Sequence, residues 1–242
     1  MPRPGGASSC YLVQAENAAV LLDIGSGAVG KLQLAIEYPR IDAIVISHMH
    51  ADHFFDLVPL RYALKYGQNL PGNALQLWLP PGGAKALEAL RRAVAVDAPH
   101  DFFDSLFAIR EYDPATPLEI RNLRLTFCRT RHYVEAYAVR AQCNGSSLTY
   151  SADTAPCEEL IEHARESSLF LCEAGLGLGT EAGERGHSSA YEAGEMAQRA
   201  GVRRLMLTHY PAGDAPAVLV AAAKRSFGGP VSVAEDGVGV TF

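Results

Sequence analysis

The sequence predicts an α/β protein in which two mixed sheets lie at the centre and helices cover their outer faces, as a single domain over residues 1–242. Short apolar runs come in antiparallel-looking series, and helical patterns follow each series. No linker, low-complexity tract or convincing tandem repeat divides the chain. Packing two sheets together, with helices outside, is the simplest way to bury these apolar faces.

Strand patterns are short apolar runs between turn residues, predicted at 11–13, 19–22, 41–46, 75–79, 118–129, 134–141, 146–150, 169–172, 203–207, 231–233 and 238–242. Helices are predicted where apolar residues recur at helical spacing, at 28–38, 52–66, 84–94, 157–166, 188–200 and 215–227. The run 41–46 is too short for a helix and is β-branched at four of its six positions. Pro39 ends the first helix, and Asn144-Gly145 forms a hairpin turn.

The segment 97–117 differs from its surroundings because it mixes aromatic and acidic residues without a clear period. It is predicted to be a short helix plus a loop, which serves either as a lid near the site or as a peripheral connection. Phe102, Phe103 and Tyr112 in this segment either stack on a substrate base or pack in the core, and core packing is the expected role of the two Phe.

Composition excludes some classes of protein. Apolar residues make up 48% and charged residues 20% of the chain, and no apolar run approaches the ~18 residues that span a bilayer, so no membrane partner is predicted. The first nine residues lack a signal pattern, and five scattered cysteines form no C-x-x-C pair; both features indicate a cytoplasmic protein with reduced thiols. The net charge of −6 argues against a dedicated nucleic-acid binder.

Metal-competent side chains cluster directly after the strand 41–46. His48 and His50 are two apart and project to one face of an extended chain, whereas Asp52 and His53 come after a turn. Asp52 is also placed to cap the following helix. A single His at a strand end is more often a satisfied polar residue, but burying four such groups without a cation would be costly. The sequence therefore predicts a metal site, and the two pairs suit two ions.

More ligands are expected at other strand ends. His132, Asp153 and His209 are each the first ligand-type side chain after an apolar strand. Each residue taken alone is more often structural, but together with the loop they complete a ligand set.

The spacing H-x-H-x-D-H at residues 48–53 resembles the signature of the metallo-β-lactamase fold hydrolases, and the resemblance extends over the chain with every ligand in family order. It implies an αββα sandwich. It also implies that His48, His50 and His132 hold one metal, that Asp52, His53 and His209 hold the other, and that Asp153 bridges them. His50 stands where flavodiiron relatives carry a Glu, which favours two zinc ions, or manganese, over iron. The family's first strand is expected to be missing or shortened here.

Glu173 and His187 narrow the resemblance to the RNase Z-like branch. There, a Glu after this strand orients a His before this helix, and the His protonates the leaving oxygen. For His187, the alternative is an ordinary surface residue. The text around 150–154 and 171–174 is similar to that of the small cyclic-nucleotide phosphodiesterases of this branch.

The resemblance implies a phosphodiesterase that hydrolyses a small nucleotide, most simply a 3′,5′-cyclic one, by attack of a hydroxide that bridges the metals. Asp52 is expected to take a proton from the attacking water, and Asp56 to contact a ligand His or lie on the helix surface. The alternatives are a tRNA 3′-end endonuclease, another hydrolase of the fold (lactonase, thioesterase or arylsulfatase) and a metal-binding scaffold. The long tRNA-binding arm of RNase Z has no counterpart between His132 and Asp153, which disfavours tRNA. A homodimer is also possible, with Met49, Phe54, Leu57 and Tyr62 in its interface.

Overall fold

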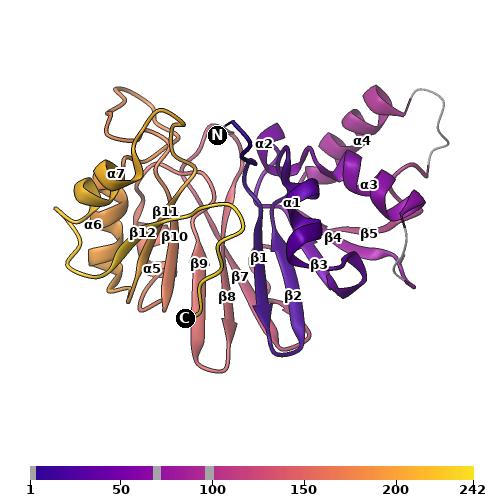
Figure 1. Cartoon of the computed structure of the whole chain (residues 1–242), viewed down its shortest axis with the longest axis horizontal. Coiled ribbons are helices and arrows are strands. Elements are labelled where there is room, and N and C mark those ends of the chain that lie inside the picture. Colours follow the sequence, from indigo (N-terminus) through magenta and orange to yellow (C-terminus); the bar gives the residue numbers. More distant parts are fainter. Residues whose placement is uncertain (1–3, 68–71, 96–100) are drawn as a thin grey trace.

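The computed structural model describes residues 4–67, 72–95 and 101–242, and these form two sheets packed face to face (Figure 1). The first sheet has the order β1-β2-β3-β4-β5, with β1 (Tyr11–Ala15), β2 (Ala18–Leu22), β3 (Ala43–Val45), β4 (Leu75–Leu79) and β5 (Phe107–Glu111). Strands β1 and β2 are antiparallel, and β2 to β5 are parallel to their neighbours.

The second sheet has the order β12-β11-β10-β9-β8-β7-β6, with β6 (Leu118–Ile120), β7 (Leu123–Arg129), β8 (Tyr137–Cys143), β9 (Ser146–Tyr150), β10 (Leu169–Glu173), β11 (Leu205–Thr208) and β12 (Val231–Val233). Pairs from β6 to β9 are antiparallel, and pairs from β9 to β12 are parallel. Both sheets are therefore mixed, as the sequence predicted.

Helices cover the outer faces and complete four layers. On the first sheet lie α1 (Ala28–Ala35), the 3-10 turn η1 (Tyr38–Arg40), α2 (Ala51–Phe54), α3 (Leu57–Tyr66) and α4 (Gly83–Val94). On the second lie α5 (Glu158–His163), α6 (Ala190–Ala200) and α7 (Pro216–Ala223). Within the described ranges, no helix combines the length and the apolar character needed to cross a bilayer.

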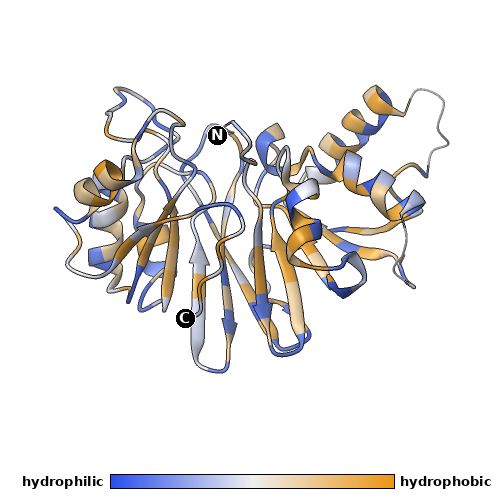
Figure 2. Ribbon diagram, in the orientation of Figure 1, coloured by the Kyte–Doolittle hydropathy of each residue, from blue (hydrophilic) through white to orange (hydrophobic). Residues whose placement is uncertain are grey.

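Three apolar clusters hold these layers together, and Figure 2 shows the apolar colouring of the inner strands. Strand β2 contributes to two of them because its side chains alternate between faces. Leu21 packs towards the helices of the first sheet, whereas Val20 and Leu22 pack against the second sheet. The apolar run 18–22 is buried throughout because it has a partner layer on each side.

Several element predictions were wrong in detail. The strand 118–129 is two strands, because Arg121 has a φ of 53° and the chain reverses there. The helix 52–66 is split into α2 and α3, and residues 238–242 form no strand. The expected antiparallel pairing is wrong for β2 to β5 and for β9 to β12, since apolar runs do not reveal strand direction.

The segment 97–117 forms no helix where the structure describes it; residues 97–100 lie outside the described ranges. It contains the edge strand β5, and Phe102 and Phe103 are buried in the core as expected. Tyr112 is also buried: its ring stacks on Phe127 at 4.0 Å, and its hydroxyl donates to the Ile46 carbonyl at 3.1 Å. None of the three aromatics is free to stack on a substrate.

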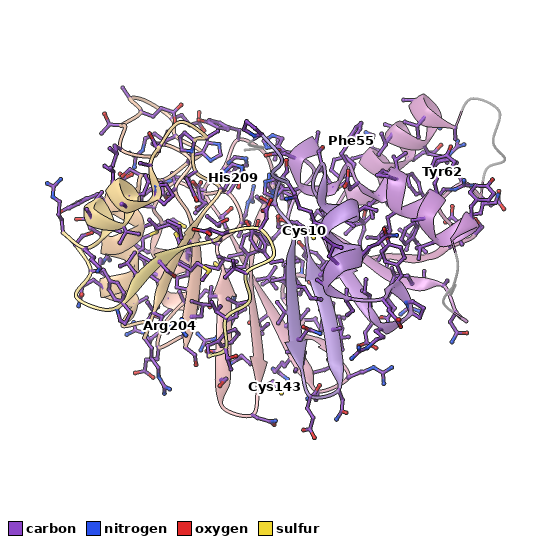
Figure 3. All side chains as sticks on the ribbon, viewed as in Figure 1. Cys10, Phe55, Tyr62, Cys143, Arg204 and His209 are labelled. Atoms are coloured by element: carbon purple, nitrogen blue, oxygen red, sulfur yellow. The ribbon has the colours of Figure 1, made fainter. Side chains whose placement is uncertain are left out.

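The suggested homodimer surface is only partly at the surface. Phe54 and Leu57 are 7% and 0% exposed and belong to the core, so they cannot form an interface. Tyr62 on α3 is 44% exposed (Figure 3). The homodimer itself stays a prediction.

Candidate metal centre

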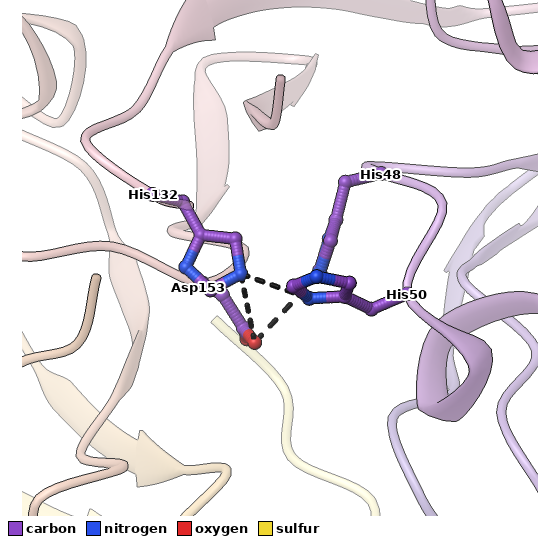
Figure 4. Close-up of side chains that lie close together, drawn as sticks. All are labelled: His48, His50, His132 and Asp153. Carbon is purple, nitrogen blue, oxygen red and sulfur yellow. Dashed lines mark hydrogen bonds and ion pairs between the residues drawn. The ribbon is translucent and has the colours of Figure 1, made fainter. Parts of the chain in front are cut away.

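The predicted ligands converge at one edge of the molecule, where strands of both sheets end. The first sheet supplies His48 and His50 from the loop after β3, and Asp52 and His53 from α2. The second sheet supplies the residues that follow β7, β9 and β11, namely His132, Asp153 and His209. Figure 3 shows His209 at this edge, and the close-up in Figure 4 shows His48, His50, His132 and Asp153.

The ligand-type atoms fall into groups, each within 4.8 Å. One group is His48, His50, His132 and Asp153, and another is Asp52, His53 and His209. Asp153 faces both: its Oδ2 lies 3.8 Å from His48 Nε2 and 3.6 Å from His209 Nε2, and its Oδ1 lies 3.4 Å from His53 Nε2. This is the division, with Asp153 between the two halves, that the family resemblance implies.

The chemistry of these side chains fits metal ions. His48 Nε2, His53 Nε2 and Asp153 Oδ1 are buried polar atoms without a hydrogen-bond partner, which is costly unless a cation engages them. Burial lowers the pKa of the His48, His50 and His132 imidazoles, so they stay neutral and able to bind a metal. Burial would raise the pKa of Asp153, but His53 and His209 outweigh it and hold that pKa well below its usual range.

Asp23 is a residue of the site that sequence analysis missed. It follows β2 and is fully buried, and its Oδ2 accepts hydrogen bonds from His53 Nδ1 at 2.7 Å and from the hydroxyls of Tyr150 and Ser47 at 2.8 Å each. Its Oδ1 accepts from the Ser47 amide at 2.7 Å. An outer carboxylate of this kind fixes the orientation of a ligand imidazole. The available signal was a carboxylate directly after an all-apolar strand, at the same sheet edge as the metal loop.

Other backbone and side-chain contacts orient the remaining ligands. His132 Nδ1 bonds the Gly186 carbonyl at 2.7 Å, and His48 Nδ1 lies 3.0 Å from Ser47 Oγ. Asp52 caps no helix; its Oδ2 lies 3.1 Å from His209 Nε2. Asp56 contacts no ligand His: it is buried and accepts from the Val29 amide at 2.9 Å, which supports the start of α1.

The backbone is strained where strands deliver these side chains. Asp23, Ala152 and His209 have φ values of 61°, 51° and 49°, a left-handed conformation that non-glycine residues rarely adopt. Each lies just beyond the end of β2, β9 or β11. Three such residues at one site indicate that the surrounding packing holds the ligands in place against a local cost.

Glu173 and His187 meet beside the ligand cluster. Glu173 ends β10 and is fully buried; it accepts from the Thr154 amide at 2.8 Å and the Gly175 amide at 2.5 Å, and its Oε1 lies 2.9 Å from His187 Nδ1. Burial raises the pKa of Glu173. Burial lowers the pKa of His187, but the hydrogen bond with Glu173 outweighs it, so the pKa of His187 lies above its ordinary value.

The position of His187 admits two roles. Its ring stacks on His209 with centroids 5.5 Å apart, and its Nδ1 is 4.0 Å from Asp153 Oδ2. Asp153, His187 and His209 form a third group within 4.8 Å, so geometry alone allows His187 to be a ligand. Glu173 already engages Nδ1, however, which leaves Nε2 as the nitrogen that can carry a proton to a substrate.

Comparison with other proteins identifies the family. Residues 19–210 match the model of the beta-lactamase superfamily domain. The protein ML1173 of Mycobacterium leprae is 33% identical (97% of this chain, 82% of the relative), and the probable metallo-hydrolase YhfI of Bacillus subtilis is 30% identical (98% and 93%). Ribonuclease Z of Ignicoccus hospitalis is 26% identical (87% and 84%).

Solved structures agree. The crystal structure of YhfI from Bacillus subtilis superposes with a TM-score of 0.87 (27% identity; 98% of this chain, 93% of that chain). A diphosphatase of the PhnP family and unliganded yeast PDE1 each superpose with a TM-score of 0.75, at 18% and 12% identity, and cover 96% and 98% of this chain and 83% and 96% of theirs. The two lower identities show the fold alone. Because the family model covers most of the chain and YhfI most of its length, this protein belongs to the beta-lactamase superfamily, as a metallo-hydrolase similar to its RNase Z-like branch.

Proposed function

We propose that this protein is a phosphodiesterase that uses two zinc ions, or manganese in their place, to hydrolyse a small nucleotide, in the first instance a 3′,5′-cyclic one. The observation that carries the proposal is the Glu173–His187 pair beside the ligand cluster. Hydrolysis of an alkyl phosphodiester needs a proton at the leaving oxygen, and this pair is placed to hold one.

The imidazoles of His48, His50 and His132 would hold one ion, and Asp52, His53 and His209 would hold the other. Asp153 would contact both ions. Bound there, the ions would lower the pKa of a water molecule and take up negative charge on the phosphate. Asp52 stays ionised at neutral pH because the His209 hydrogen bond holds its pKa far below its usual range, which suits a ligand. Its second role, as proton acceptor from the water, stays a prediction.

His187 and Glu173 do the remaining work on the leaving-group side. Glu173 is held by two backbone amides, so it presents a fixed oxygen to His187 Nδ1 and sets the direction of the ring. The raised pKa of His187 keeps the imidazole protonated to higher pH, ready to protonate the leaving oxygen. Glu173 is a positioning residue that acts through His187.

The small substrate is supported by two features. Between His132 and Asp153, the described chain is filled by β8 and β9, with no room for a long tRNA-binding arm. The net charge of −6 also opposes binding of a polyanion. The similarity to Ribonuclease Z favours tRNA 3′-end cleavage as the second candidate.

The test is turnover by the zinc- or manganese-loaded protein on three substrates: bis(p-nitrophenyl) phosphate, 3′,5′-cyclic AMP and a pre-tRNA with a 3′ trailer. We expect hydrolysis of the first two, abolished in Asp153→Ala, because that substitution removes the carboxylate that faces both ligand groups. Trailer cleavage without cyclic AMP turnover would assign the protein to the endonuclease class. If the protein bound two metals but turned over none of the three substrates, the phosphodiesterase proposal would be rejected.

The pH profile of Glu173→Gln tests the proton donor. The protonated form of His187 is the active one, so wild-type activity falls on the alkaline side as this proton is lost. The neutral amide removes the interaction that raises the pKa of His187, and the alkaline limb of kcat is therefore expected to move to lower pH. An alkaline limb at the wild-type position would separate Glu173 from the proton transfer.

A further inference from the structure

The mouth of the site carries an exposed aromatic residue that the proposed mechanism does not use. Tyr133 directly follows the ligand His132, and its ring centroid lies 5.2 Å from that of His132 and 5.9 Å from that of His187. The residue is 52% exposed, and its hydroxyl donates to Glu181, with the two carboxylate oxygens at 2.9 and 3.0 Å. The ring therefore links the metal centre, the proton donor and a carboxylate from the loop between β10 and α6.

This ring is held in place by the backbone of Gly186. A Cβ at this glycine would lie 2.5 Å from a Tyr133 ring carbon, so only glycine lets the backbone approach so closely. The carbonyl of the same Gly186 accepts the His132 Nδ1 hydrogen bond, and the next residue is His187. Gly186 lies close to one edge of the Tyr133 ring, and because the residue is half exposed, part of it is available to a bound molecule.

The carboxylate of Glu181 is consequently a positioned negative charge near the proton donor. One tyrosine ring separates it from the proton donor, because the Tyr133 hydroxyl bonds Glu181 at 2.9 Å and the Tyr133 ring centroid lies 5.9 Å from that of His187. The nearby Arg185 does not neutralise it, because Arg185 pairs with Glu192 at 2.8 Å. A further negative charge on a leaving group would be repelled here.

We propose that Tyr133 and Glu181 form the leaving-group subsite and select phosphodiesters whose leaving group is an uncharged, flat or hydroxyl-bearing alcohol over those whose leaving group carries a further negative charge. The Tyr133 ring offers a stacking surface, and Glu181 accepts hydroxyls and repels anions. The inference rests on the proposed phosphodiesterase function and narrows its substrates. It also excludes long polynucleotides on the leaving side.

The experiment compares two esters that differ by one charge: methyl p-nitrophenyl phosphate, and the same ester with a carboxylate on the nitrophenyl ring. At low ionic strength, the wild-type kcat/KM is expected to favour the uncharged leaving group by about fivefold to tenfold. Glu181→Gln should bring the ratio close to that of the uncatalysed reactions, and added salt should weaken the preference in the wild type only. Tyr133→Phe keeps the ring but removes the hydroxyl that bonds Glu181, so a partial loss of the preference for the uncharged leaving group is expected.

Glu184→Gln is the matched control, because it removes one charge from the same loop at an exposed residue. An unchanged ratio in Glu181→Gln, or an equal fall in Glu184→Gln, would overturn the subsite while leaving the proposed function intact. Failure of the metal-loaded protein to hydrolyse either ester would reject the function instead. In that case, calorimetric titration of the metal-free protein with the two esters tests the subsite. The ester with the uncharged leaving group should bind more tightly, and Glu181→Gln should reduce this difference. Equal dissociation constants in the wild type would reject the subsite.

Discussion

His187→Ala is expected to lower kcat for 3′,5′-cyclic AMP by about 100-fold or more, because an alkoxide is a poor leaving group without a proton. The kcat for bis(p-nitrophenyl) phosphate should fall much less, since p-nitrophenolate departs without protonation. The measurement is steady-state kinetics of both substrates with wild-type and variant protein at one metal loading. A large ratio between the two losses is the signature of a proton donor.

The same pair of substrates separates the two roles that the geometry of His187 allows. If His187 were a metal ligand, as its place in the group with Asp153 and His209 permits, the variant would bind less metal and lose activity on both substrates alike. Metal content after gel filtration decides this directly. Equal losses with lowered metal content would contradict the proton-donor assignment.

Asp23→Ala is expected to lower the free energy of unfolding of the metal-free protein by about 3–5 kcal/mol. The carboxylate accepts four hydrogen bonds in a fully buried position, from His53, Tyr150 and twice from Ser47. Removing it strands three buried polar side chains at once, one of them an imidazole. Urea denaturation followed by circular dichroism gives the change.

Asp23→Asn is the informative companion because it keeps the shape and removes the charge. The Asn side chain keeps one oxygen that can accept hydrogen bonds, but its NH2 group would face groups that themselves donate to Asp23 in the wild type. The loss of stability is therefore expected to be intermediate. Since Asp23 orients the His53 imidazole, zinc affinity should also fall, by about 10- to 100-fold. If both variants kept the wild-type stability and zinc affinity, the hydrogen bonds of Asp23 would neither stabilise the fold nor orient His53 for metal binding.

The convergence of these side chains could be predicted because the candidate ligands fall within the first residues after apolar strands, and the structure brings them together. That they bind metal stays a prediction. Strand ends are readable in sequence, and His48 to His53 give four such groups in six positions. Asp23 also follows an apolar strand, but it stands alone there, and a lone carboxylate before Gly25 looks like an ordinary turn residue. Only the fold shows that this turn lies against the metal loop, where a Cβ on Gly25 would lie 1.9 Å from the Asp52 carbonyl oxygen.

The arrangement of strands and the segment 97–117 were harder for a different reason. The apolar pattern of a short run shows which of its faces is buried but not the direction of its neighbour, so neither β2 to β5 nor β9 to β12 could be identified as parallel. In the segment, Phe102 and Phe103 fill the core beneath α3 as expected, but the mixture of aromatic and acidic residues gave no sign of the edge strand β5. Their burial depends on contacts distant in sequence, such as Arg61 of α3, whose guanidinium carbon lies 4.2 Å from the Phe102 ring centroid.

The ligands come from both sheets, and this has a consequence for the protein in a cell. An ion that engages His48 or His53 from one sheet and Asp153 from the other binds only when the two halves are assembled. Such an ion stabilises the folded chain by about 2.7 kcal/mol when its free concentration is 100 times its dissociation constant. Scarcity of the metal would then shorten the lifetime of the protein as well as abolish its activity. The abundance of the protein would therefore follow the metal supply.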